Sequence, residues 1–157
     1  MKKLKLFVTT LLFLLALCIP TYAQTTSTRV AKNQTQLEKL ISNKKVKIIQ
    51  INTTKKTTIT IPKGTYKKRI VVNSPKSTIV NNGKFVSITI NNATKYIEKS
   101  KGNTISIKDS KLKFSVTKNA IVNHLIKFKE KSDLQIVCKG KIKKYAVKTT
   151  NPVEKSE

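Results

Sequence analysis

The chain has few of the residues on which most catalytic and metal-binding sites depend. Its 157 residues include one histidine, two cysteines, seven acidic residues and no tryptophan. A lone histidine without a partner cysteine does not make a typical zinc site, and no serine–histidine–acid set can be assembled. No glycine-rich phosphate loop is present either. The sequence therefore predicts no catalytic residue, no metal site and no cofactor, and it argues against an enzyme.

The acidic residues are also too scattered for chemistry that needs paired carboxylates. The interval between Glu98 and Asp109 is far shorter than one turn of the repeat described below. Asp109 and Glu130 are separated by close to one such turn and could stack on neighbouring turns. On so basic a chain, such a pair is more simply a charge compensation than a calcium site or an acid–base pair.

The N-terminal segment resembles a leader and not part of a fold. Three lysines precede an apolar run that ends at Ile19, and Ala23 supplies a small residue at a cleavage point. The run is shorter than the roughly 20 apolar residues that a membrane span needs. We therefore expect a signal peptide over residues 1–23, cleaved after Ala23, no transmembrane segment, and a secreted or cell-surface protein.

Removal of the leader leaves a single cysteine, Cys138, so no intramolecular disulfide can form. Alternation of apolar and polar residues places this thiol on the same side as Leu134 and Ile136, which favours an inward, unreactive cysteine. The mature protein must then be stabilised by packing and backbone hydrogen bonds.

Isoleucine and valine recur in two series at a nearly fixed interval, which is typical of stacked repeats. These series are Ile48, Ile70, Ile88, Ile107 and Ile126, and Ile59, Ile79, Ile97, Val116 and Ile136. Apolar and polar residues alternate around them, which indicates short strands with one buried face. We predict an all-β fold, a small right-handed parallel β-helix of about five turns. The alternative is an antiparallel β-sandwich or barrel, which the hairpin signal Asn82-Gly83 favours.

The ends of the domain have their own patterns. Thr35 and Glu38 match a capping box, and apolar residues follow at helical spacing. We therefore expect the β-helix domain to cover residues 35–147, with a cap helix over residues 35–43 that closes the first turn. Residues 24–34 are predicted to be a flexible lead-in, and residues 148–157 a disordered tail.

Four segments carry a resemblance to a known family. They are residues 37–40 (LEKL), 46–51 (VKIIQI), 59–66 (ITIPKGTY) and 80–83 (VNNG). Together they look like the opening of exported right-handed β-helix proteins of the pectin-lyase-like superfamily. The resemblance implies the fold. Enzymes of that superfamily act on polysaccharides, whereas many small members are surface or adhesive modules, so an activity does not follow from it.

Lysine supplies nearly all of the charge. The formal net charge is +26, and it falls to +23 when the leader removes three lysines and no acid. Stacked turns would align lysines into stripes that attract polyanions. The residues expected to form such stripes are Lys47, Lys67, Lys68, Arg69, Lys108 and Lys127. Scarce arginine and the lack of interleaved aromatic residues argue against a sequence-specific nucleic-acid partner.

The function that these patterns favour is binding without catalysis. We expect an exported β-solenoid that associates through a lysine-rich face with an anionic cell-wall polymer or an acidic polysaccharide. One alternative is a passive structural spacer of the cell envelope, in which the lysines only solvate a β protein with many edges. A polysaccharide-active enzyme is the third and least favoured class. The sequence leaves the oligomeric state open.

Overall fold

The computed structural model is a parallel β-solenoid of about six turns, one more than the sequence predicted. The structure describes residues 27–108, 111–128 and 133–148. All strand pairings within these ranges are parallel, which excludes the antiparallel alternative. The predicted signal peptide, the end of the predicted tail (149–157) and the Asp109–Glu130 pair lie outside the described residues. No helix in those ranges is long and apolar enough to cross a membrane.

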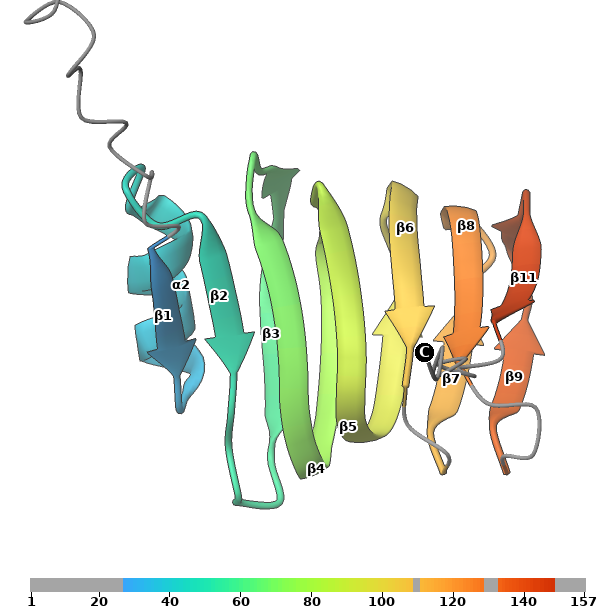
Figure 1. Ribbon diagram of the computed structural model, residues 1–157, viewed down its shortest axis with the longest axis horizontal. Helices are drawn as coiled ribbons and strands as arrows, with labels where there is room; N and C mark the ends of the chain where they lie inside the picture. Colours follow the sequence, from blue (N-terminus) through green and yellow to red (C-terminus); the bar gives the residue numbers. More distant parts are fainter. Residues whose placement is uncertain (1–26, 109–110, 129–132, 149–157) are drawn as a thin grey trace, which may run out of the picture.

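The turns stack along the long axis of the molecule (Figure 1), and the strand pairings divide the turns into three sides. The first side contains β1 (Thr28–Ala31), β2 (Ile48–Ile51), the first halves of β4 (Arg69–Lys84) and β5 (Ser87–Glu98), the end of β6 (Lys101–Ile107), the end of β8 (Ile121–Phe128), and β11 (Tyr145–Lys148). The second side contains β3 (Thr58–Thr65), the second halves of β4 and β5, β7 (Lys113–Val116) and β9 (Gln135–Cys138). The third side contains the ends of β3 and β4, the starts of β6 and β8, and β10 (Lys141–Ile142).

Inward side chains from successive turns stack in columns and form the core. One column consists of Ile49, Ile70, Ile88, Ile105 and Leu125, and another of Ile59, Ile79, Tyr96, Phe114 and Ile136. All of these except Ile136 are at most 2% exposed. The rings of Tyr96 and Phe114 stack with centroids 5.6 Å apart. Each buried side chain of this size contributes about 1.5–3 kcal/mol, so the columns hold the turns together.

The predicted stacking register is only partly correct. The structure confirms the pairs Ile70–Ile88 and Ile59–Ile79. The predicted inward position is wrong for Ile48, Ile97 and Ile126, whose side chains lie on the outer side of their strands, next to an inward residue. The side chains of Ile107 and Val116 do point inward, but they belong to neighbouring columns. The physical reason is that turn length varies, since the turn from Ile88 to Ile105 is several residues shorter than the turn from Phe114 to Ile136. A fixed interval therefore drifts out of register.

Helix α2 (Gln34–Ser42) covers the first end of the core, as predicted. Its cap differs from the prediction, because Asn33 and not Thr35 is the N-cap. The Asn33 Oδ1 accepts the amide of Gln36 at 2.9 Å, and the Gln36 side chain accepts the amide of Lys32 at 2.8 Å. Asparagine is among the strongest N-cap residues, so it fixes the start of the helix. The lead-in prediction is wrong for Thr28–Ala31, which pair with β2 as strand β1.

Gln34, the first residue of α2, protects the open edge of the second side. Its Oε1 accepts the amide of Thr60 at 2.9 Å, and its Nε2 donates to the Thr60 carbonyl at 2.8 Å. One side-chain amide thus satisfies both backbone groups that a further strand would use. Gln34 therefore obstructs the addition of a further strand to β3 at Thr60.

Candidate polyanion-binding surface

A groove of about 770 Å³ runs along the corner between the second and third sides. It is lined by Lys63, Gly64, Thr65, Asn82, Lys84, Lys99, Ser100, Lys101 and Asn119, and is called the lysine groove below. Its four lysines are exposed, and none of its lining residues is acidic. Because stacked strands lie about 4.8 Å apart, lysines from neighbouring turns can contact one polymer.

Strand pairing brings these lysines together from three consecutive turns. Lys84 pairs with Thr65 on the turn before, and the amide of Lys99 donates to the Asn81 carbonyl at 2.8 Å. Lys84 extends over Gly102, where an added Cβ would lie 3.4 Å from the Lys84 Cε. Gly102 has a φ of +90°, a conformation that residues with a side chain rarely adopt. The backbone conformation, and not the contact with Lys84, is therefore what requires glycine at this position.

A second hollow, of about 290 Å³, adjoins the groove on the side of α2 and shares Thr65 with it. This helix-side hollow is lined by Ile41, Ser42, Lys44, Val46, Lys47, Thr65, Tyr66, Lys67 and Lys68. It also has no acidic lining residue. Two of the predicted site residues, Lys47 and Lys67, are thus exposed side by side next to the lysine groove.

Lys68 has a different place from the one the stripe prediction gave it. Its side chain is 7% exposed, and its Nζ donates to the carbonyls of Asn43 at 2.5 Å and Val46 at 2.8 Å. Burial lowers the pKa of this ammonium, and the positive charge of Lys47 lowers that pKa further. Asn43 is the C-cap of α2, where a cation is favourable. Lys68 ties the helix to the solenoid, and its ammonium is held by these two carbonyls at the edge of the helix-side hollow.

The remaining predicted site residues do not join this surface. Arg69 is exposed on the first side, beside Ile48 and Ser87. Lys108 follows β6, and its Nζ lies 5.7 Å from the centre of the Phe128 ring. Lys127 pairs with Ile107 in an inward column and is half-buried, so Lys108 and Lys127 are not in register with each other. The predicted stripe through these two residues is therefore not formed.

A buried polar cluster lies directly behind the lysine groove. Glu98 is fully buried, and its carboxylate accepts hydrogen bonds from four groups. The donors are the Asn81 side chain at 2.9 and 3.0 Å, the Tyr96 hydroxyl at 3.0 Å, the Ser100 amide at 2.9 Å and the Asn103 side chain at 3.2 Å. Ser100 also lines the groove, so the cluster fixes the backbone between Lys99 and Lys101.

Burial raises the pKa of Glu98 to about 7, although the hydrogen bond from Asn81 and the other donors oppose the shift. A perturbed carboxyl beside a groove is a common sign of catalysis. Glu98, however, has no exposed surface and cannot touch a molecule in the groove. Within the described residues, no three histidine, cysteine or acidic side chains gather to hold a metal ion. The cluster therefore has a structural role.

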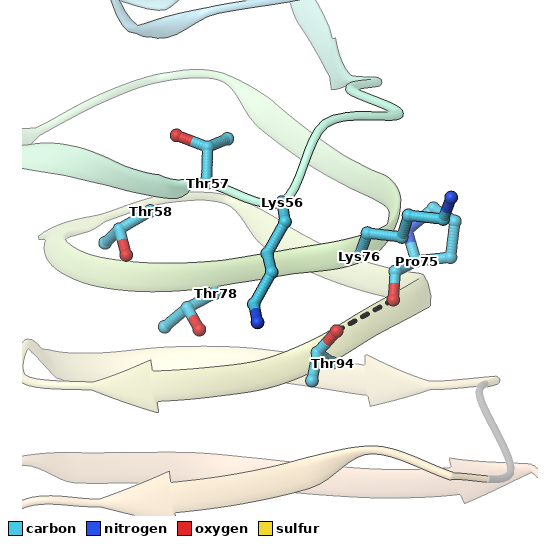
Figure 2. Close-up of a pocket in the computed structure, with 7 residues that line it drawn as sticks. All are labelled: Lys56, Thr57, Thr58, Pro75, Lys76, Thr78 and Thr94. Atoms are coloured by element: carbon cyan, nitrogen blue, oxygen red, sulfur yellow. Dashed lines mark hydrogen bonds between the residues drawn. The ribbon is translucent and has the colours of Figure 1, made fainter.

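A further hollow, of about 450 Å³, lies at the corner between the first and second sides (Figure 2). Lys56, Lys76 and four threonines contribute to its lining, and the hydroxyl of one of them, Thr94, donates to the Pro75 carbonyl at 2.8 Å. Two lysines line this hollow, against four in the lysine groove.

Sequence reasoning missed the four groove lysines, although their types and spacing were visible. Lys84 and Lys101 are separated by the same interval as Ile88 and Ile105, which pair across a short turn. Reading that spacing required knowledge that turn length varies.

No protein-family model matches the chain, and neither does any curated protein or solved structure with which it was compared. Fold and surface place it in the class of small parallel β-solenoids with a concentrated basic surface.

Proposed function

We propose that this protein is an exported, non-catalytic β-solenoid that associates with an anionic cell-surface polymer, either a cell-wall polymer or an acidic polysaccharide. The observation that carries the proposal is the continuity of the lysine groove and the helix-side hollow through Thr65. Seven exposed lysines line these two hollows without one acid: Lys44, Lys47, Lys63, Lys67, Lys84, Lys99 and Lys101.

The chemistry of this surface fits a polymer better than a small ligand. Lysine is a flexible point charge that attracts anionic groups without fixing their geometry, whereas arginine forms the planar fork that specific recognition uses. The groove spans several turns, so it can contact successive charged units of one chain. Asparagine, serine and threonine between the lysines can donate hydrogen bonds to hydroxyl or phosphate oxygens.

Two further parts of the proposal rest on the sequence. The leader over residues 1–23 supports secretion or display at the cell surface. The resemblance to the pectin-lyase-like superfamily agrees with a parallel solenoid and supports a distant place in that superfamily. A polysaccharide-active enzyme is disfavoured because, among the described residues, the acidic side chain nearest the groove, Glu98, is buried.

The proposal predicts selective, salt-sensitive binding. Residues 24–157 would be titrated by isothermal calorimetry with a cell-wall polymer, an acidic polysaccharide, DNA and anionic vesicles at several salt concentrations. We expect affinity for each polyanion to fall as salt rises, and one cell-surface polymer to remain bound at physiological salt. Equal binding to all four that disappears at physiological salt would favour the passive spacer instead.

A further inference from the structure

The two ends of the solenoid differ: α2 lies at the first end, and β9 and β11 lie at the other (Figure 1). The inward residue of the last rung on the second side, Ile136, is 39% exposed, although those of the earlier rungs are at most 2% exposed. Cys138 lies on the same inward side of β9, as predicted, but its side chain is exposed, and among the described strands β9 is the last rung of the second side. Six large apolar side chains are exposed in the described residues, and four of them belong to this turn: Ile136, Val137, Tyr145 and Val147. This end is therefore an apolar surface.

Within the described residues, the same end carries backbone groups that have no strand partner. In a parallel sheet, alternate residues direct both N–H and C=O toward opposite neighbours. The Leu125 amide donates to the Lys144 carbonyl at 2.9 Å, so the alternation turns the backbone groups of Tyr145 and Val147 outward. By the same rule, the Lys139 amide bonded to Val116 turns those of Ile136 and Cys138 outward. Among the described residues, β9 pairs only with β7 and β11 only with β8.

The surroundings of this edge are strongly basic. Its described residues, 133–148, contain one acid, Asp133, which is exposed. They contain five exposed lysines: Lys139, Lys141, Lys143, Lys144 and Lys148. Any partner that covers the edge must compensate a local excess of positive charge.

We propose that this end binds an extended acidic segment of another protein, which adds to β9 or β11 as a further parallel strand. Strand addition satisfies the outward amides and carbonyls, places alternate apolar side chains over the exposed core, and leaves the intervening acidic side chains near the lysines. A second copy fits less well, because two such ends would bring ten lysines together. A bilayer fits less well because it offers no regular partner for the backbone groups. At the opposite end, Gln34 satisfies the amide and carbonyl of Thr60 on β3, and the edge strand β1 serves as an internal reference.

The test uses residues 24–157 and a short probe peptide of alternating valine and glutamate. Amide hydrogen exchange at Ile136, Tyr145 and Val147 would be followed by NMR. We expect the peptide to slow exchange at residues of one strand by about tenfold or more, with no change at β1. A matched peptide with lysine in place of glutamate should give no protection.

A second probe separates strand addition from simple charge attraction. In this fold, residues whose side chains face solvent direct their amides toward the preceding turn, and the glutamates of an added peptide would occupy such positions. Methylation of the glutamate nitrogens should therefore abolish protection. In the protein, Val147→Pro removes an amide that points toward the open edge and takes no part in the pairing of β11 with β8. This substitution should weaken binding by about tenfold. Val30→Pro, at the outer edge of β1, is the matched control and should bind normally.

Several outcomes would overturn the proposal. Equal protection by the N-methylated peptide would reduce the effect to electrostatics. Concentration-dependent dimerisation that protects the edge without peptide would make a second copy the occupant. Protection that is present without peptide and lost when the chain ends at Lys148 would assign the edge to the protein's own C-terminal segment. No protection by any peptide would exclude strand addition of this kind.

Discussion

Glu98→Ala should destabilise the fold by about 3–5 kcal/mol, measured by urea unfolding at pH 5.5. The substitution removes the acceptor shared by Asn81, Tyr96, Ser100 and Asn103, and it leaves a cavity between two turns. Buried donors without partners are costly, and these come from β4, β5, β6 and the bend between β5 and β6. A loss below about 1 kcal/mol would contradict the central position given to this carboxylate.

Glu98→Gln is the matched control, because it keeps the volume and removes the ionisation. The pKa of Glu98 is about 7 in the folded protein against 4.5 for the unperturbed group. The folded state therefore binds the proton more tightly, and this contribution to stability is complete below pH 4.5 and lost as pH rises through about 7. The difference in stability between the wild type and Glu98→Gln should change across that window. A constant difference from pH 4 to pH 8 would show that Glu98 does not titrate there.

The second large effect is expected in the lysine groove. Changing its four lysines to glutamine should weaken binding to the preferred anionic polymer by roughly a thousandfold at low salt, since each lysine near an anionic surface contributes about 1 kcal/mol. The salt dependence should become shallower by about three units of slope. The substituted residues are Lys63, Lys84, Lys99 and Lys101.

A control with the same net charge separates location from total charge. It replaces four exposed lysines that line neither the lysine groove nor the helix-side hollow with glutamine: Lys55, Lys76, Lys95 and Lys113. We expect this variant to lose at most about tenfold in affinity, because long-range attraction alone is changed and salt screens it. Equal losses in the two variants would mean that the charge acts without a defined site.

The sequence predicts the architecture because alternation and recurrence are properties of single strands and of their spacing. Alternation within a single strand identifies inward residues such as Ile59, Ile61 and Ile79. The helical spacing of Leu37 and Ile41, both buried, predicts the helix. The N-cap was misplaced because Asn33, Thr35 and their neighbours offer competing caps, and tertiary packing of α2 decides between them.

The site is harder to predict, because it depends on the register between turns. A fixed repeat placed Lys108 above Lys127, whereas the actual pairing sets Lys127 against Ile107. The fixed repeat also gave no reason to expect that Lys68 is buried or that the Glu98 side chain contacts Asn81. These contacts join residues from different turns, far apart in the sequence, and variable corners decide which of them form.

The most direct test of the polyanion surface is a lysine footprint. Each lysine of residues 24–157 would be acetylated under limiting conditions, with and without the preferred anionic polymer, and its reactivity read by mass spectrometry. We predict protection concentrated at Lys63, Lys84, Lys99 and Lys101 and extending to the exposed lysines of the helix-side hollow. Lys55, Lys76, Lys95 and Lys113 should keep their reactivity. Uniform protection of all exposed lysines, or protection centred outside the two hollows, would contradict the account.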